Sequence, residues 1–175
     1  MRERRARKPR SASLEVLETL VLAIVLALLI RTFVVESYQV SGYSMYPTLQ
    51  TGERVLVNKL IYRFSAPEPG QIIVFRSPVI PSQDWIKRVI GVPGDRVAIR
   101  NGQVYVDGRL QPEPYVRYRG HSNYAAVTIP PGYLFVLGDN RPNSYDSRYF
   151  GLLKESLVRG EAFLVWWPPK AFRGL

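Results

Sequence analysis

Two stretches of this sequence carry residues whose types and spacing could perform catalysis. The first, SGYSMYPTL, places Ser44 among small residues ahead of Pro47, and the second, WIKRVIGVPGD, contains Lys87. A serine hydroxyl is a weak nucleophile until a neighbouring base takes its proton, and a lysine amine can be that base only when it is neutral. The two residues are therefore a candidate catalytic pair, provided that the fold brings them into contact.

The surroundings of Ser44 suit a turn that a substrate can approach closely. Small residues permit close approach of the backbone, and Pro47 stiffens the chain that follows. Taken alone, an exposed loop serine is most often a turn-forming residue. Ser44 gains interest because its segment directly follows a long apolar run, which would place it near a membrane surface.

Lys87 lies at the end of an apolar segment that reads as a strand. Strand alternation puts it on the same face as Trp85 and Val89. Lysine is rarely buried on an apolar face, and burial disfavours the charged ammonium and lowers its pKa. Lowering the pKa from about 10.4 to about 8 corresponds to about 3 kcal/mol, which burial can supply. The alternative is a strand lysine whose amine reaches out to water.

A third stretch, GDNRPNSYDSRYFG, follows another strand-like segment and contains the remaining candidates. Its glycine, aspartate and asparagine favour a turn, in which Ser144 could hydrogen-bond a neighbouring amine. Asp146 and Arg148 are two residues apart and could form an ion pair that holds the loop. Read singly, each of these is an ordinary loop residue.

The elements that must position these residues are predicted to be short β-strands. Segments rich in Val, Ile, Tyr and Phe recur after residue 35, separated by Gly, Pro, Asn and Asp. Asn101-Gly102 predicts a two-residue hairpin turn, and Asp107-Gly108 predicts a turn after the next strand. The predicted fold class is mainly β, with an antiparallel sheet that coils or partly closes to limit its free edges. Strands are expected in the segments RVLVNKLIYRF, QIIVFRSP, WIKRVIGV, DRVAIR, QVYVDG and YLFVLG.

Three other segments after residue 35 have less definite patterns. A short helix is predicted from Lys154 to Val158, and residues 109–131 read as a long loop without a predicted conformation. The segment FLVWWPP, residues 163–169, suits either the bilayer interface or a final core strand. Its alternation leaves both interpretations open.

An apolar run over residues 14–35 precedes the β segments. As a helix it spans about 33 Å at ~1.5 Å per residue, which matches the hydrocarbon thickness of a bilayer. A buried helix of a soluble domain and a cleaved secretory signal are the alternatives. The segments that follow look complete without the run, and no small-x-small cleavage site comes after it. We therefore predict a transmembrane anchor over residues 13–35 and an extracytoplasmic domain over residues 36–175.

Positive charge is concentrated before the apolar run. The chain carries +10, of which residues 1–10 contribute +5, with six basic residues against Glu3. A basic arm can contact nucleic acid, but no nucleic-acid motif occurs later in the chain. Beside an apolar run, the same charge marks the cytoplasmic side. Residues 1–12 are therefore predicted to be a basic cytoplasmic segment, and no nucleic-acid partner is expected.

The composition limits cofactor chemistry. The sequence has no cysteine and one histidine, His121, which lies in a polar segment. Disulfides, thiolate metal sites and sites with several histidine ligands are therefore excluded. A reaction between a serine and a neutral lysine needs no metal or cofactor, and none is expected.

Taken together, the three stretches resemble the sequence boxes of type I signal peptidases, membrane-anchored Ser/Lys proteases that remove leader peptides from exported proteins. The similarity is carried by SGYSMYPTL, KRVIGVPGD and GDNRPNSYDSR, in that order after an anchor. It implies that Ser44 is the nucleophile, that Lys87 is the general base and that Ser144 orients the lysine amine. It also implies a supporting role for Asp146 and Arg148. The family fold is a coiled antiparallel β domain on the outer face of the plasma membrane, and the resemblance implies proximity to the secretion translocon.

Two positions depart from the family pattern. Some members carry a serine two residues before the nucleophile that contributes to the oxyanion hole, whereas this chain has Gly42. The oxyanion must then rely on backbone N–H donors, including that of Ser44; one oxyanion donor contributes about 2.7–4 kcal/mol in other enzymes. Pro142 stands where many members have a polar residue, and it is expected to stiffen the loop without touching the catalytic pair.

The resemblance also implies that the substrate is the signal peptide of an exported pre-protein. An extended segment would add as a strand beside residues 38–41 and residues 84–86. Shallow apolar pockets would accept alanine-sized side chains at the first and third positions before the cut, as in the small-x-small pattern of signal peptides. The pocket candidates are Val40, Met45, Leu49 and Ile86, and the other substrate-binding candidates are Tyr38, Asp84 and Trp85.

Two rival functions fit parts of the sequence. A self-cleaving repressor protease also pairs serine with lysine, but it is soluble and carries a DNA-binding helical domain. A membrane-tethered β module that only binds a partner would not need Ser44 and Lys87 in their boxes. We therefore favour a membrane-bound peptidase.

Overall fold

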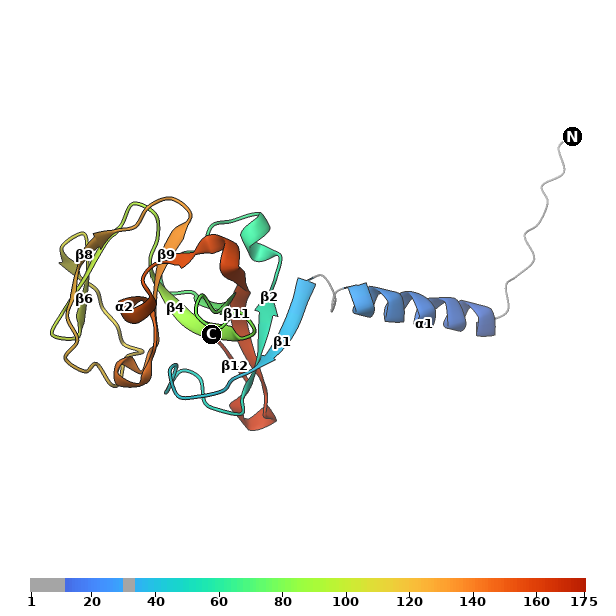
Figure 1. Cartoon of the computed structure of the whole chain (residues 1–175). Helices are drawn as coiled ribbons and strands as arrows, with labels where there is room; N and C mark the ends of the chain where they lie inside the picture. Colours follow the sequence, from blue (N-terminus) through green and yellow to red (C-terminus); the bar gives the residue numbers. More distant parts are fainter. Residues whose placement is uncertain (1–11, 30–33) are drawn as a thin grey trace, which may run out of the picture. The chain divides into compact units, whose positions relative to one another are not determined.

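The computed structural model describes residues 12–29 and 34–175 of the chain. The chain divides into two compact units, Met1–Val34 and Val35–Leu175. Helix α1, Ala12–Leu29, belongs to the first unit. All described strands belong to the second, which we call the β domain (Figure 1).

Helix α1 carries large apolar side chains that are exposed around the helix, with Leu22 at 68% and Val25 at 47%. In the part of the chain that the structure describes, no helix combines the length and apolarity needed to cross a membrane. The predicted basic segment and the predicted anchor reach into residues 1–11 and 30–33, which lie outside the described residues. The anchor therefore stays a prediction.

Two antiparallel sheets build the β domain. The larger runs in the order β1-β2-β11-β3-β4-β9-β10, with β12 paired to β11, and the smaller runs in the order β7-β6-β5-β8. The larger sheet consists of β1 (Val35–Gln39), β2 (Arg54–Asn58), β3 (Ile72–Arg76), β4 (Asp84–Gly91), β9 (Tyr133–Leu137), β10 (Leu153–Lys154), β11 (Val158–Trp167) and β12 (Arg173–Gly174). The smaller consists of β5 (Arg96–Arg100), β6 (Gln103–Val106), β7 (Arg109–Leu110) and β8 (Tyr124–Thr128). The prediction of a mainly β, antiparallel fold is confirmed.

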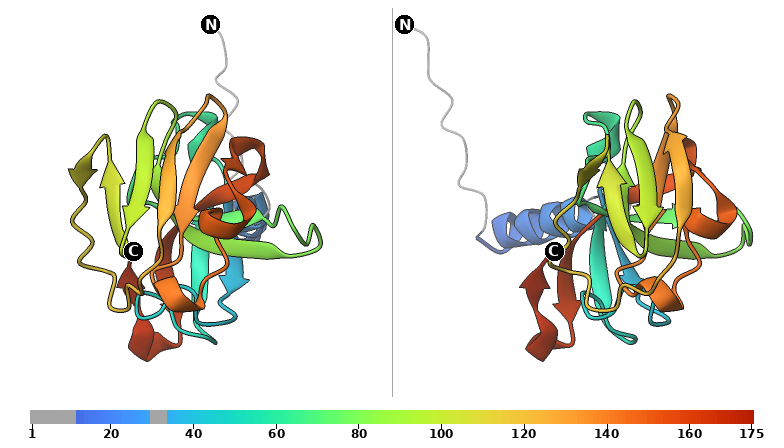
Figure 2. Two further views of the ribbon diagram at one scale, coloured as in Figure 1. Left: turned by 60° about the vertical axis from the view of Figure 1, so that its left-hand side comes forward. Right: turned by 90° about the vertical axis from the view of Figure 1, so that its left-hand side faces the viewer.

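The larger sheet is curled. Strands β1 and β4 stand four places apart in its order, yet residues of both line one cleft. This is possible only if the sheet bends back toward itself as a half-barrel. Both views in Figure 2 show that the strands of the β domain do not lie in one plane.

Burial follows the strand positions. In β2, Val55 and Val57 are fully buried and alternate with less buried neighbours, as expected for a strand with one covered face. Strand β3 is buried at four successive residues because it is covered on both faces. One apolar cluster, built around Val55 and Val57, also takes in Met45 and Leu49 from the stretch SGYSMYPTL, residues 41–49, which we call the serine segment. The serine segment is thereby attached to the core of the larger sheet.

Turn chemistry accounts for the hairpins. Asn101 and Gly102 adopt φ of 47° and 75° and join β5 to β6, and Asp107 and Gly108 adopt 52° and 77° before β7. Positive φ at both central positions is the geometry that these dipeptides favour. Both predicted turns are confirmed.

The short helices differ from the sequence prediction. The helix expected from Lys154 to Val158 is a 3₁₀ turn, because the chain is extended at both of these residues. A four-residue helix, α2 (Ser147–Phe150), lies in the third stretch and was not predicted, because so short an element has no helical periodicity. The 3₁₀ helices are η2 (Ile61–Arg63), η3 (Arg141–Asn143), η4 (Glu155–Leu157) and η5 (Pro169–Ala171).

The tryptophan-rich segment is part of the final long strand. Val165 in β11 is fully buried and Trp167 is about half exposed. Two residues apart, they would share a face in a regular strand, but the pairing with β2 shifts register between them, as at a β-bulge. Trp166 donates a hydrogen bond from Nε1 to Ser37 Oγ in β1 (2.9 Å). The strand interpretation is therefore confirmed, while contact of this segment with the bilayer interface stays a prediction.

Candidate active site

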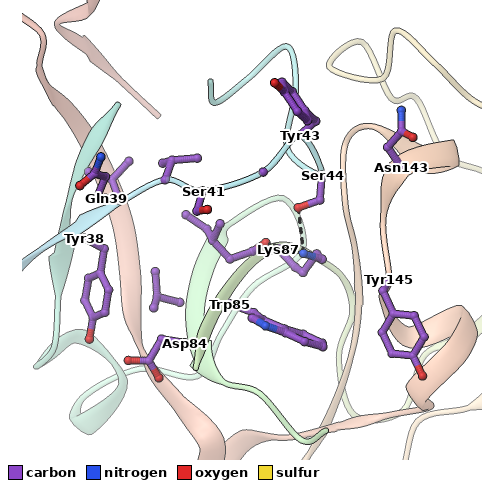
Figure 3. A pocket seen from close by; sticks show the side chains of 15 residues that line it. Tyr38, Gln39, Ser41, Tyr43, Ser44, Asp84, Trp85, Lys87, Asn143 and Tyr145 are labelled. Atoms are coloured by element: carbon purple, nitrogen blue, oxygen red, sulfur yellow. Dashed lines mark hydrogen bonds between the residues drawn. The ribbon is translucent and has the colours of Figure 1, made fainter. Parts of the chain in front are cut away.

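Ser44 and Lys87 meet at one end of a cleft in the β domain. The Lys87 amine donates a hydrogen bond to Ser44 Oγ (3.0 Å) and a second to the carbonyl of Ile86 (3.0 Å). Figure 3 shows this contact at one end of the cleft, with Tyr38 and Asp84 toward the other. The two candidate residues are 43 positions apart in the sequence, so the fold is what brings them together.

The environment of Lys87 is nearly dry. The residue is 5% exposed, and this burial lowers the pKa of its amine from 10.5 to about 8. The carboxylates of Asp146 and Asp139 act in the opposite direction, since negative charge favours the ammonium form. Burial is the larger effect. With this pKa about a tenth of the amine is in the neutral form required for a base at pH 7, far more than for an ordinary lysine.

The backbone of Ser44 is held by the third stretch. The Asn140 N–H donates to the Ser44 carbonyl (2.9 Å), and its side-chain amide donates to the carbonyl of Tyr43 (3.1 Å). A side chain on Gly138 would meet the Ser44 carbonyl oxygen at 2.5 Å and Ser144 Oγ at 2.3 Å. Gly138 is thus required for the serine segment and the third stretch to lie this close.

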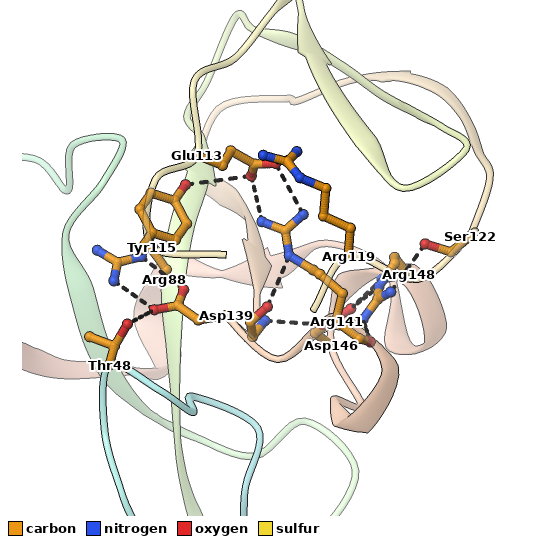
Figure 4. A network of polar contacts seen from close by, with 11 residues as sticks. Thr48, Arg88, Glu113, Tyr115, Arg119, Ser122, Asp139, Arg141, Asp146 and Arg148 are labelled. Carbon is orange, nitrogen blue, oxygen red and sulfur yellow. Dashed lines mark hydrogen bonds and ion pairs between the residues drawn. The ribbon is translucent and has the colours of Figure 1, made fainter. Parts of the chain in front are cut away.

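Asp139 links the strand of Lys87 to the segment of Ser44. Arg88, the next residue after Lys87, donates to Asp139 from Nε (2.9 Å) and from Nη2 (2.7 Å). Thr48, which ends the turn after Ser44, donates from Oγ1 to the same carboxylate (2.5 Å). Asp139 is fully buried, and the pairing satisfies both of its oxygens (Figure 4). The sequence reasoning missed Asp139, although the GDN turn that contains it had been noted.

The structure contains the ion pair between Asp146 and Arg148. Arg148 Nε lies 2.8 Å from Asp146 Oδ1, and Nη2 lies 2.8 Å from Oδ2. Asp146 also caps helix α2 and accepts from the Gly138 N–H (3.1 Å), so it holds the loop at both ends. Arg148 donates further to the carbonyl of Arg141 (2.6 Å).

Ser144 is buried beside these residues. Its Oγ is the buried side-chain oxygen for which no hydrogen-bond partner is present among the described residues. The lysine amine bonds to Ser44 and Ile86 in this structure, so the predicted contact between Ser144 and Lys87 is not formed here. The role of Ser144 stays a prediction.

A third buried ion pair joins the third stretch to residues 109–131 and was not predicted. Arg141 pairs with Glu113 through both terminal nitrogens, and Glu113 also accepts from Arg119 (3.4 Å) (Figure 4). Arg141 and Glu113 are 2% and 3% exposed. Because Glu113 belongs to residues 109–131, this pair fastens the segment without a predicted conformation to the third stretch. No local pattern in the sequence identifies a pair 28 residues apart.

The cleft beside the pair has a volume of about 290 Å³. Of the substrate-binding candidates, Tyr38, Val40, Asp84, Trp85 and Ile86 line it. Gln39 and Ser41, within the predicted binding segment 38–41, also line it, whereas the prediction missed Val55, Val74, Asn143 and Tyr145.

Two pocket candidates lie elsewhere. Met45 and Leu49 are 1% and 0% exposed and belong to the apolar cluster under the cleft rather than to its surface. The turn that exposes Ser44 directs the next apolar side chains inward. Met45 and Leu49 therefore support the floor of the cleft and do not face a substrate.

No group of three or more His, Cys, Asp or Glu side chains is arranged to hold a metal ion within residues 12–29 and 34–175.

Known protein families and solved structures were compared with this chain, and the match includes all three stretches described above. The family described as "Signal peptidase, peptidase S26" matches residues 13–167 of this chain. The chain belongs to the signal peptidase family. The resemblance inferred from the three boxes is therefore confirmed, and so is the prediction of an enzyme: the family members are serine peptidases, a class of hydrolase.

Curated relatives match over most of their length. A probable signal peptidase I-2 of Synechocystis sp. is 41% identical, covering 91% of this chain and 76% of the relative. The signal peptidase I of Bacillus caldolyticus is 42% identical, covering 82% of this chain and 85% of the relative. A crystal structure of a signal peptidase I from Enterococcus faecalis superposes with a TM-score of 0.51 at 35% identity, covering 55% of this chain and 97% of that one. The curled β architecture is thus shared with a solved signal peptidase.

Replacing Lys87 by Met should stabilise the protein near neutral pH. The pKa of Lys87 is lower in the fold than in the unfolded chain, so the unfolded chain binds more protons between about pH 8 and pH 10.5. The free energy of unfolding of the parent therefore rises with pH across that window. Below it, the buried charge costs about 3 kcal/mol, at ~1.36 kcal/mol per pKa unit. Allowing for the lost contact with Ser44, Lys87→Met should be more stable by about 1–2 kcal/mol at pH 7.

Urea unfolding at pH 7 and at pH 10 measures this difference. The gain should shrink at the higher pH, and Lys170→Met, at an exposed position, should show no pH-dependent gain. An equal gain for Lys87→Met at both pH values would mean that the Lys87 amine is not destabilised by burial.

Proposed function

We propose that this protein is a membrane-anchored endopeptidase that removes signal peptides from exported pre-proteins, with Ser44 as nucleophile and Lys87 as general base. Family membership supports the substrate class, since the curated relatives are signal peptidases I. The observation that carries the mechanism is the 3.0 Å contact between Ser44 Oγ and a lysine amine whose burial lowers its pKa to about 8.

In this mechanism the neutral Lys87 amine takes the hydroxyl proton while Ser44 Oγ attacks the carbonyl carbon before the cut. The resulting ammonium then donates the proton to the leaving amine of the mature chain. In the second half, the amine takes a proton from a water molecule, which attacks the acyl-enzyme ester. The released serine oxygen recovers the proton, so one peptide bond and one water are consumed.

The oxyanion is assigned to backbone donors. Across the described residues, the Ser44 N–H donates no hydrogen bond to another protein group, which leaves it free for a substrate oxygen. Gly42 adopts φ of 86°, a conformation that disfavours residues with a side chain. A serine at this position would be strained in the present turn, so glycine here is consistent with an oxyanion site built from the backbone.

A substrate is proposed to bind as an extended strand between β1 and β4. Strand β1 ends the order of the larger sheet and pairs only with β2 among the described strands. On β4, pairing with β9 begins at Arg88, so the described pairings leave the edge from Asp84 to Lys87 open. Both open edges border the cleft. A strand between them can hydrogen-bond to two neighbours, which is the β-addition mode of peptide recognition.

Small side chains before the cut suit the apolar part of this cleft. Val40, Val55, Val74 and Ile86 contribute branched aliphatic groups to a space of only about 290 Å³. Alanine-sized residues fit such a space, whereas larger ones would require the lining to move. This supports cleavage after a small-x-small motif.

Ser144 is proposed to position the lysine amine during the reaction. Its buried hydroxyl has no partner among the described residues, and an unpaired buried hydroxyl is unfavourable unless something uses it. Asp146 and Arg148 would act through the loop that they hold in place.

The anchor is proposed to be helix α1 together with the residues that follow it, with residues 1–12 in the cytoplasm and the β domain outside. The described part of α1 exposes apolar side chains that water solvates poorly. The basic residues before it orient such a helix with its N-terminus inside. A location in the plasma membrane near the secretion translocon follows from the proposed substrate.

Cleavage should depend on both members of the pair. A pre-protein whose leader ends in Ala-x-Ala should be cut by the parent, whereas Ser44→Ala and Lys87→Ala should each lose at least about 10³-fold in kcat/KM. Ser65→Ala and Lys170→Ala, at exposed positions, are matched controls and should retain the parent rate. Undiminished cleavage by Lys87→Ala would remove lysine from the role of base.

The pH–rate profile should follow the lysine. Because the neutral amine is the active form, kcat/KM should rise about tenfold per pH unit below about pH 8 and level off above it. Initial rates on the same pre-protein between pH 6 and pH 10.5 measure this. A midpoint near 10.5, the ordinary lysine value, would show that the base is not a buried amine.

The anchor prediction is tested in the cell membrane. The full chain should stay in the membrane pellet after extraction with alkaline carbonate, and charge introduced by Leu22→Arg with Val25→Arg should release a large fraction. Phe64→Arg, at an 86% exposed position of the β domain, is the control and should not change the pelleted fraction. Complete extraction of the parent chain would refute the anchor.

A further inference from the structure

A second cleft lies on the other side of Ser44. It encloses about 670 Å³ and is lined by aromatic and amide side chains, among them Tyr43, Tyr46, Tyr118, Gln50 and Asn143. Tyr43 and Asn143 also line the first cleft, so the two spaces adjoin at these residues. Ser44, which follows Tyr43, therefore stands where one cleft gives way to the other.

The wall of the second cleft is built by segments far apart in the sequence. The rings of Tyr46 and Tyr118 stack with centroids 6.2 Å apart and an interplanar angle of 23°. Tyr118 is held by its backbone, which forms a bridge with Asn140 and accepts from the Arg141 N–H (3.1 Å). Residues 109–131, whose conformation the sequence did not predict, thus bring an aromatic ring beside the serine segment. Pro142, where many family members have a polar residue, completes the wall.

We propose that this second cleft binds the first residues of the mature polypeptide, those directly after the cut, and selects uncharged and especially planar side chains among them. This inference rests on the proposed function. An endopeptidase substrate continues on both sides of the scissile bond, and its leader side is assigned to the first cleft. The chain that leaves Ser44 in the other direction meets the second cleft within two or three residues, at ~3.3 Å per residue.

The chemistry of the lining supports this selectivity. None of the residues that line the second cleft carries a carboxylate, amine, guanidinium or imidazole. A charged substrate side chain that enters it would lose hydration without gaining a counter-charge. A planar side chain can pack on the tyrosine rings, and the amides of Gln50 and Asn143 can bind the substrate backbone.

The test uses the full-length enzyme and a set of pre-proteins with one Ala-x-Ala leader. The set carries Tyr, Gln, Asp or Lys in turn at each of the first three positions after the cut, and kcat/KM is measured for each. At one of these positions at least, Tyr and Gln should be preferred over Asp and Lys, with Tyr over Gln by about two- to tenfold. In Tyr118→Ala the advantage of Tyr should disappear, while the requirement for Ala before the cut should be unchanged.

The control variant is Tyr105→Ala, which removes a tyrosine of the smaller sheet that lines neither cleft. It should keep the full preference of the parent. If Tyr118→Ala keeps that preference too, or if the parent shows none, the inference is wrong although the proposed function stands. If no pre-protein is cleaved, the proposed function itself fails.

Cross-linking locates the mature residues directly. In the Ser44→Ala protein, a pre-protein with a photoreactive phenylalanine analogue at the second position after the cut should attach to the peptides that contain Tyr46 or Tyr118. Attachment confined to β1 or to residues 84–87 would overturn the assignment, because it would place the mature chain in the first cleft.

Discussion

The active site depends on one buried ion pair, that of Arg88 with Asp139. Strand β4 carries Lys87 directly before Arg88, and Asp139 also accepts from Thr48 at the end of the serine turn. One carboxylate therefore helps to set the separation between Lys87 and Ser44, the proposed base and nucleophile. Removing one partner of such a pair leaves an uncompensated buried charge and costs about 3–5 kcal/mol. The pairing costs desolvation energy, but it makes the relative position of the segments that carry Ser44 and Lys87 part of the folded state rather than a mobile arrangement.

Two arginines, Arg88 and Arg148, help to keep the Lys87 amine neutral. Asp139 and Asp146 both lie near enough to raise the pKa of Lys87, and unpaired they would favour its ammonium form. Each is instead engaged by an arginine, Arg88 for the first and Arg148 for the second. Their negative charge is directed toward guanidinium groups, and burial remains the dominant influence on the amine. The three sequence boxes thus supply the proposed reactive groups, Ser44 and Lys87, together with the paired charges that leave the Lys87 amine largely governed by burial.

The sequence predicted what depends on local pattern. Residue composition and alternation identified β2, β3, β4, β5, β6 and β9, whereas β7 and β8 lie in the segment read as a loop. Dipeptides such as Asn101-Gly102 identified turns, and the order of the boxes led to Ser44 and Lys87. It failed where contacts join distant segments. Burial of Leu49 follows from the direction of a turn that packs on the sheet. The conformation of residues 109–131 follows from bonds to the third stretch, which no periodicity encodes.

The two unpaired edges that border the first cleft have a consequence for the leader itself. Neighbouring strands lie ~4.8 Å apart, so a gap bridged from both sides by main-chain bonds is about 10 Å wide and admits a single extended backbone. A helix is about 10–12 Å across with its side chains, too wide to lie between two strands whose axes are only about 10 Å apart, and its own main-chain groups are already satisfied. If leaders bind as proposed, those that reach the enzyme as helices must unravel their last turn before they can be cut. Two leaders with identical residues at the cut can then be processed at different speeds, according to how readily that turn comes apart.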